Sequence, residues 1–222
     1  QDMDAKIVLL YWSLHHKHGH QDILYSLQGY KYLLHHTYAQ LDKDADFTGR
    51  ARLVQLLAGR QYKLSVETAA PDSLRLGQFR TPPANNDDKG GACSFVFGSC
   101  VGGQGYGPRA GDGAESGFPA FTAMQAMDPD FFVCNGDFIY ADNAIEAVAT
   151  TPWNAGLEHV VGEGMAVASD LTSFRARYRY HLADPKLSSF LARTPMLSTW
   201  DDHEITNNFD PEKMAIEQPE RL

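Results

Sequence analysis

Short apolar runs that end in polar or glycine-rich residues divide the second half of the chain into predicted strands. The runs are Ser94–Phe97, Phe131–Cys134 and Pro195–Trp200. Between them, residues 118–127 and 171–190 show helical patterns, and Asp184-Pro185 breaks the second pattern into two helices. Alternation of strands and helices in this order predicts a parallel sheet with helices packed on it.

The first part of the chain has a different pattern, in which apolar and polar residues alternate as in antiparallel strands. The segments that predict strands are Lys6–Trp12, residues 50–66 as two strands around a turn at Gly59, and residues 77–81. Residues 82–91 contain two prolines, polar residues and glycines, which is the composition of a linker. We therefore predict a small β-sandwich domain over residues 1–82 and a partial α/β domain over residues 92–222.

Histidines cluster in the stretch 15–42, at His15, His16, His18, His20, His35 and His36. A metal-binding tract is one interpretation of such a cluster. A solvated hairpin or helical insertion is the other, and we favour it because no carboxylate or cysteine completes a ligand set there.

The composition of the chain argues against several classes of protein. With 43% hydrophobic and 21% charged residues, the 222-residue chain has the composition of a globular protein. No apolar stretch reaches the ~18 residues of a membrane span. The net charge of -9 argues against a stable nucleic-acid partner, but a bound metal would still allow a phosphate substrate. Three cysteines cannot form a disulfide framework, and Cys93 and Cys134 are predicted to be small buried residues.

Polar groups with metal-binding chemistry follow all three predicted strands of the α/β domain. Cys100 comes after the first strand, Asp137 and Tyr140 after the second, and residues 201–204 with Asn207 after the third. Ligands of open α/β sheets bind beyond the carboxyl ends of the strands. Because unpaired carboxylates are costly to bury, a metal cluster is a reason for this convergence.

The residue types indicate what each group can bind. A Cys100 thiolate favours a transition metal, and an Asn207 carbonyl oxygen suits a harder cation. Asp137 has two oxygens that can bridge two cations, and Gly136 before it lets backbone and metal approach closely. Taken alone, Asp137 is also compatible with a helix cap, Tyr140 with a core aromatic and Cys100 with a small buried residue. Their shared position after strands favours function.

These segments resemble the motifs of the PhoD-like alkaline phosphatases, within the calcineurin-like metallophosphoesterase superfamily. The motifs are Phe97-Gly-Ser-Cys100, Asn135-Gly-Asp-Phe-Ile-Tyr140, and Trp200-Asp-Asp-His-Glu204 with Asn207. The resemblance covers residues 92–209 well. Residues 45–82 resemble the end of the small immunoglobulin-like domain that precedes the catalytic domain in this family, and residues 1–44 match poorly.

The resemblance implies a metallophosphoesterase-like layered α/β domain after an immunoglobulin-like β-sandwich. It implies hydrolysis of phosphate monoesters or diesters by a metal-activated water, in a secreted or periplasmic protein. Iron (Fe3+) would be bound by Cys100, Asp137 and Tyr140, and calcium (Ca2+) by Asp137 and Asn207. The resemblance gives Asp202 and His203 catalytic roles, either orienting ligands or hydrogen-bonding the phosphate.

Members of the family are typically longer, and their remaining metal ligands follow downstream. We therefore expect this chain to be an N-terminal fragment of such a protein, with a small phosphoester as substrate. The alternative is a non-catalytic extracellular binding module derived from the family. A degenerate module has no need to keep the Cys100, Asp137, Tyr140 and Asn207 set together, so we favour the enzyme.

Overall fold

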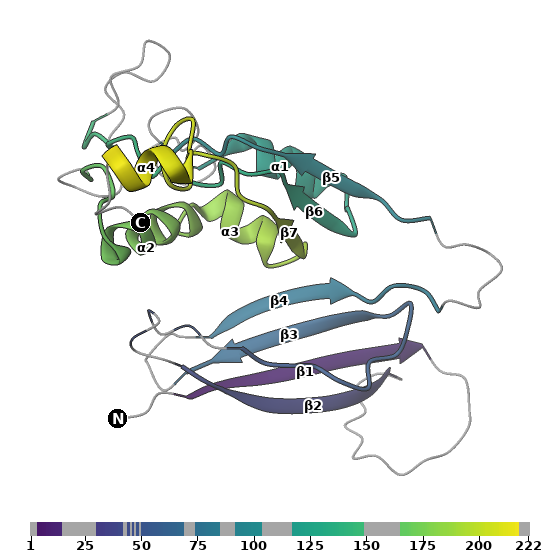
Figure 1. The fold of residues 1–222 in the computed structure, drawn as a ribbon. Helices are drawn as coiled ribbons and strands as arrows, with labels where there is room; N and C mark the ends of the chain where they lie inside the picture. Colours follow the sequence, from purple (N-terminus) through teal and green to yellow (C-terminus); the bar gives the residue numbers. More distant parts are fainter. Residues whose placement is uncertain are drawn as a thin grey trace. The chain divides into compact units, whose positions relative to one another are not determined.

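The computed structural model describes residues 4–14, 30–41, 50–68, 74–84, 92–103, 117–148 and 165–217, with residues 44, 46 and 48. The chain divides into two compact units, Gln1–Cys93 and Ser94–Leu222 (Figure 1). The division falls at the end of the predicted linker, and the type of each domain stays a prediction.

The first unit contains one four-stranded antiparallel sheet with the order β2-β1-β3-β4 (Figure 1). Its strands are β1 (Asp4–Leu14), β2 (Tyr30–Gln40), β3 (Gln61–Glu67) and β4 (Arg75–Arg80). The described strands of this unit all belong to the one sheet, so the second sheet of the predicted sandwich is not shown.

The predicted strand before Gly59 is wrong, because residues 50–60 contain no strand and only the second half of the predicted hairpin, β3, is extended. Tyr62 is buried, and its hydroxyl oxygen accepts a hydrogen bond from the backbone N–H of Leu57 at 2.7 Å. The residues packed against Tyr62 are Leu53, Leu56, Leu64 and Phe79. The regularly spaced leucines therefore belong to a loop that covers the β3–β4 pair.

The histidine-rich stretch is described only in its second part. His35 and His36 lie in β2, which pairs antiparallel with β1, as the hairpin interpretation requires. The cluster from His15 to His20 lies outside the described residues.

The second unit follows the predicted alternation of strands and helices. Its elements are β5 (Phe95–Gly98), α1 (Pro119–Ala126), β6 (Phe131–Cys134), α2 (Leu171–Leu182), α3 (Pro185–Leu191), β7 (Met196–Ser198) and α4 (Pro211–Glu217). The sheet order is β5-β6-β7, and both pairings are parallel. Because the three strands run parallel, their carboxyl ends lie at the same edge of the sheet. The last helix, α4, was not predicted.

Two aspartates cap the starts of α2 and α3. Asp170 and Ser173 form a capping box at the start of α2. Asp184 caps α3 by accepting from the backbone N–H groups of Lys186 and Leu187 at 3.0 and 2.9 Å. Its second oxygen accepts from Phe118 N at 3.0 Å, so one carboxylate ties the starts of α1 and α3 together.

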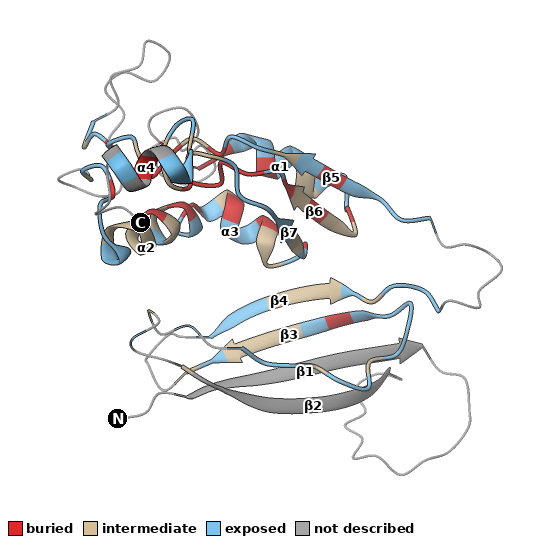
Figure 2. Cartoon of the chain, viewed as in Figure 1, coloured by how far each residue is buried: buried red, intermediate tan, exposed pale blue. Residues whose placement is uncertain are grey.

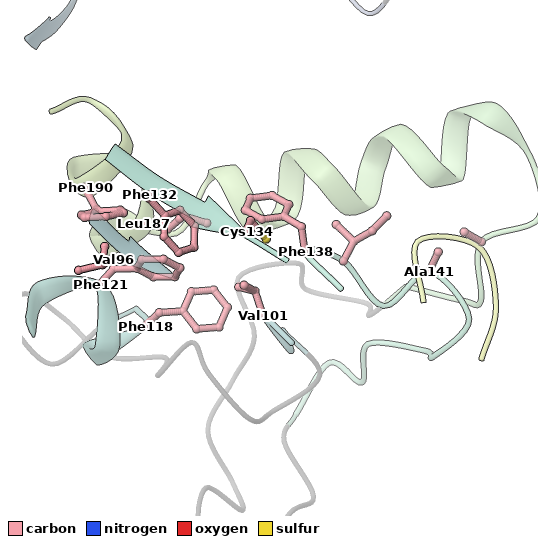
Figure 3. Close-up of a cluster of buried hydrophobic side chains, with 12 residues drawn as sticks. Val96, Val101, Phe118, Phe121, Phe132, Cys134, Phe138, Ala141, Leu187 and Phe190 are labelled. Carbon is pink, nitrogen blue, oxygen red and sulfur yellow. The ribbon is translucent and has the colours of Figure 1, made fainter. Parts of the chain in front are cut away.

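One face of the parallel sheet carries the core of the unit. Phe121 of α1, Phe132 of β6 and Phe190 of α3 form a cluster of ring contacts with centroid separations of 5.4–5.9 Å (Figure 3). The alternate positions Phe95, Phe97 and Leu197 are exposed within the described residues (Figure 2). The alternation of strand side chains explains this division, because the helices α1 and α3 cover only one face.

The cysteines are free, and their burial differs from the prediction at one position. Cys134 is fully buried in the core of β6, as predicted. Cys93 is exposed, because it precedes β5 and lies outside the packed cluster. No helix among the described residues is long and apolar enough to cross a membrane.

Candidate metal centre

Two loops, after β6 and after β7, approach each other so closely at one point that only glycine fits. Gly136 has φ of +98°, and a Cβ placed there would lie 2.5 Å from both the backbone nitrogen and the Cβ of Asp201. The sequence predicts that Gly136 makes room for a metal. The structure shows that the missing side chain admits the backbone of Asp201, and the approach of a metal stays a prediction.

A buried carboxylate then joins the two loops. Glu204 is 4% exposed and accepts hydrogen bonds from the backbone N–H groups of Asp137, Phe138 and Asp201. The donor–acceptor distances are 3.1, 2.6 and 2.9 Å. The sequence indicates no role for Glu204 beyond its place in the motif. Both of its oxygens accept hydrogen bonds within the loops, so Glu204 holds the backbones of the two loops together.

The side chains of Cys100, Asp137 and Tyr140 converge on one oxygen atom. The Cys100 thiol lies 3.5 Å from Asp137 Oδ2, and the Tyr140 hydroxyl lies 3.4 Å from the same atom. The other oxygen of Asp137 accepts from His203 N at 3.2 Å. Asp137 is buried, whereas Cys100 is exposed, so the group opens from the interior toward the surface.

The backbone is strained at this cluster. Cys100 and Asp137 have φ of 58° and 53°, a left-handed conformation that costs most L-residues roughly 1–2 kcal/mol and aspartate less. Such strain persists only where surrounding contacts hold it. Here the backbone N–H groups of Cys100 and Val101 donate to the carbonyl oxygens of Gly136 and Asp137 at 3.3 and 2.8 Å.

The phenol of Tyr140 is neutral in this environment. Burial raises its pKa, and hydrogen bonding and charge at Cys100 and Asp137 raise it further. A phenol, a thiol and a carboxylate in contact are the donors that a transition metal binds in deprotonated form. The donor set therefore fits a metal that displaces protons when it binds.

His203 is held by a carboxylate that the sequence motifs do not include. Its Nδ1 lies 2.9 Å from both oxygens of Asp142, and its ring stacks on Tyr140 with centroids 4.3 Å apart. A carboxylate only accepts hydrogen bonds, so the contact places the proton on Nδ1 and leaves Nε2 for other partners. Partial burial lowers the pKa of His203, but the hydrogen bond and charge of Asp142 outweigh it and raise that pKa.

Asp142 lies two residues after Tyr140, at a spacing that matches no motif of the predicted site. Its carboxylate also accepts from the backbone N–H of Asn207 at 2.7 Å, and thereby joins the loop after β6 to the loop after β7 a second time. Only the pairing of these loops in space reveals that role.

The remaining predicted residues lie in the loop after β7. One ligand atom from each of Asp137, Asp202 and His203 can be found within 4.8 Å of the others, which is compatible with a shared cation. Asp202 also accepts from the backbone N–H of Asn208. Asn207 is exposed, and its backbone rather than its side chain supplies the contact to Asp142, so its role as a metal ligand stays a prediction.

Comparison with known proteins adds two findings. The family model described as PhoD-like phosphatase matches residues 95–221. A solved structure titled "Structure of PhoD" is similar, with a TM-score of 0.61 and 21% sequence identity. That match covers 94% of this chain and 34% of the solved chain, and at this identity it shows the fold alone. No curated protein matches the chain.

Proposed function

Because the chain belongs to the PhoD-like phosphatase family, we propose that it supplies part of a metal-dependent phosphoesterase site. Family membership supports hydrolysis of small phosphoesters. The observation that carries the proposal is the contact of Cys100 and Tyr140 with the same oxygen of Asp137. A thiol, a phenol and a carboxylate in contact at the carboxyl edge of a sheet can serve together as metal ligands.

The proposed iron ligands are Cys100, Asp137 and Tyr140. Asp137, shared with the iron, and the side chain of Asn207 are the proposed calcium ligands. When bound, the cations supply Lewis acidity that draws electron density from the phosphate oxygens and favours deprotonation of the attacking water.

Asp202 and His203 would act on the substrate. With Nδ1 held by Asp142, the Nε2–H of a protonated His203 can donate to a phosphate oxygen. Asp202 lies beside it and would orient a ligand or the attacking water. The stacking of His203 on Tyr140 fixes the ring plane, so the donated hydrogen has a defined direction.

We also propose the finer domain and location assignments that the family resemblance implied. The first unit would be the small immunoglobulin-like domain of the family. The protein would be secreted or periplasmic. Circular dichroism of residues 1–93 alone and fractionation of cells that express the protein test these two assignments.

The metal proposal is tested by colour. Ferric iron bound by thiolate and phenolate is expected to give a visible charge-transfer band when the chain is loaded with Fe3+ and Ca2+. Cys100→Ser should weaken the band and Tyr140→Phe should shift it. Cys93→Ser is the matched control, because that exposed thiol lies outside the site. A colourless protein that hydrolyses an aryl phosphate with zinc alone would show that the metals are wrong.

A further inference from the structure

Arg177 of α2 is the largest fully buried side chain among the described residues, and most of its guanidinium is unpaired there. Its Nη2 donates to the carbonyl oxygen of Ala166 and, at 3.5 Å, to that of Met165. Nε and Nη1 are buried without a hydrogen-bond partner in the described part of the chain. A buried cation this poorly compensated costs stability, so an apolar side chain would serve packing better.

The two carbonyl groups that Arg177 binds belong to a short segment, residues 165–168, which we call the strap. Met165 and Ile145 exchange two backbone hydrogen bonds, of 2.8 and 2.7 Å. Ala168 N donates to Ala141 O at 2.8 Å. The strap therefore holds both ends of residues 141–145.

That held segment contains Asp142 and borders the metal centre. Ala141 N donates to the carbonyl oxygen of His203 at 2.9 Å, and Asp142 holds the ring of the same histidine. The chain of contacts runs from Arg177 through the strap to Asp142 and His203. Burial lowers the pKa of Arg177, and attraction to Tyr180 and Asp142 opposes this, so the guanidinium also lies within electrostatic reach of Asp142.

We propose that Arg177 is a positioning residue that fixes the Asp142–His203 pair by clamping the strap against residues 141–145. Its consequence for catalysis rests on the proposed function, whereas the clamp itself is a property of the chain. The guanidinium is suited to the task because the two N–H groups of Nη2 can donate to two successive carbonyl oxygens, and the group keeps its charge when buried.

The test uses Arg177→Met, which keeps length without the clamp, and Arg177→Lys, which keeps the charge. Arg179→Met is the control, because Arg179 is exposed on the same helix. Loss of the clamp should speed amide exchange at Ile145 and Ala168 by about tenfold or more, with the amides of β6 unchanged. Lysine should restore part of this protection.

A second readout is the tautomer of the neutral His203 ring, measured by nitrogen NMR in the metal-free chain at a pH above the pKa of the ring. The proton should reside on Nδ1 in the unmodified chain and shift in part to Nε2 in Arg177→Met. Arg177→Lys should restore the Nδ1–H form in part. A residue that only fills the space of Arg177 would not restore it. If Arg177→Met does not fold, Arg177→Lys carries the test, with exchange at Ile145 about threefold faster.

Unchanged exchange at Ile145 and Ala168, or an unchanged His203 tautomer, would overturn the clamp. Faster exchange spread equally over β6 would also overturn it, since Arg177 would then only stabilise the unit. Failure of the unmodified chain to bind iron or calcium would instead contradict the proposed function, because both clamp readouts need no metal.

Discussion

Asp137 is the residue on which the site depends, because its oxygens receive contacts from the loops after β5, β6 and β7. Oδ2 faces Cys100 and Tyr140, and Oδ1 accepts from the backbone of His203. Its left-handed backbone, with φ of 53°, tolerates asparagine better than other side chains. Asparagine at this position therefore removes the charge of the side chain and keeps the conformation of the backbone.

We expect Asp137→Asn to lose metal binding and phosphoester hydrolysis while it folds normally. The amide keeps the size and the backbone preference but cannot bridge two cations as a carboxylate does. Metal content by elemental analysis and the melting temperature check the two parts. Hydrolysis of a generic aryl phosphate at a rate near that of the unmodified protein would refute the bridging role.

At the scale of elements, Glu204 holds the loop after β6 and the loop after β7 in one arrangement. Glu204→Ala leaves three N–H groups without an acceptor, the buried ones of Asp137 and Phe138 and the partly buried one of Asp201. We expect a loss of about 3–5 kcal/mol in the free energy of unfolding of the second unit. Urea denaturation measures it.

The matched control is Glu212→Ala, an exposed acid whose loss should change stability by less than ~0.5 kcal/mol. The stability of Glu204→Gln should lie between those of Glu204→Ala and Glu212→Ala, because one amide oxygen replaces two carboxylate oxygens. Equal stability of Glu204→Ala and Glu212→Ala would mean that water replaces the lost acceptor.

The elements of the second unit could be predicted because each apolar run ends in residues that break the pattern. Asp184-Pro185 marks the end of α2 and the start of α3 as predicted, and β6 has the predicted bounds. The strand predicted within residues 50–60 was wrong because regularly spaced leucines also occur in a loop that packs against a sheet. Sequence periodicity does not distinguish the two.

The missed residues of the site share one physical property. Asp142 holds the ring of His203, which lies 61 residues away. Glu204 accepts from two N–H groups that lie 66 and 67 residues away, besides its contact with Asp201 in its own loop. Their roles follow from loops brought together by the parallel sheet. No local pattern records such partners, whereas Cys100, Asp137 and Tyr140 stand out by position after strands.

At the scale of the whole molecule, acid stability is expected to depend on His181. The residue is fully buried, and its Nδ1 and Nε2 face the carbonyl oxygens of Arg177 and Val101 at 3.0 and 2.7 Å. Burial lowers the pKa of His181 despite these contacts. The unfolded chain therefore binds a proton at higher pH than the folded chain, so stability is lost as pH falls below about 6.5.

The slope contributed by one such proton is at most about 1.4 kcal/mol per pH unit. His181→Gln should be less stable at pH 7.5, since it keeps only part of the hydrogen bonding, but its stability should fall less between pH 7.5 and 5.5. Urea denaturation at the two pH values measures this difference. Parallel losses in both proteins would show that His181 is not the group responsible.

The left-handed backbone at Cys100 has a consequence for protein engineering. A cysteine at φ of 58° is held there against its own preference, which asparagine or glycine would satisfy. Selection for heat resistance alone would therefore discard the thiol: we expect Cys100→Asn to raise the free energy of unfolding by up to about 1 kcal/mol and to abolish the ferric band. A melting curve and a visible spectrum of the same sample would expose the trade-off, and a less stable Cys100→Asn would show that the thiol contributes to the fold.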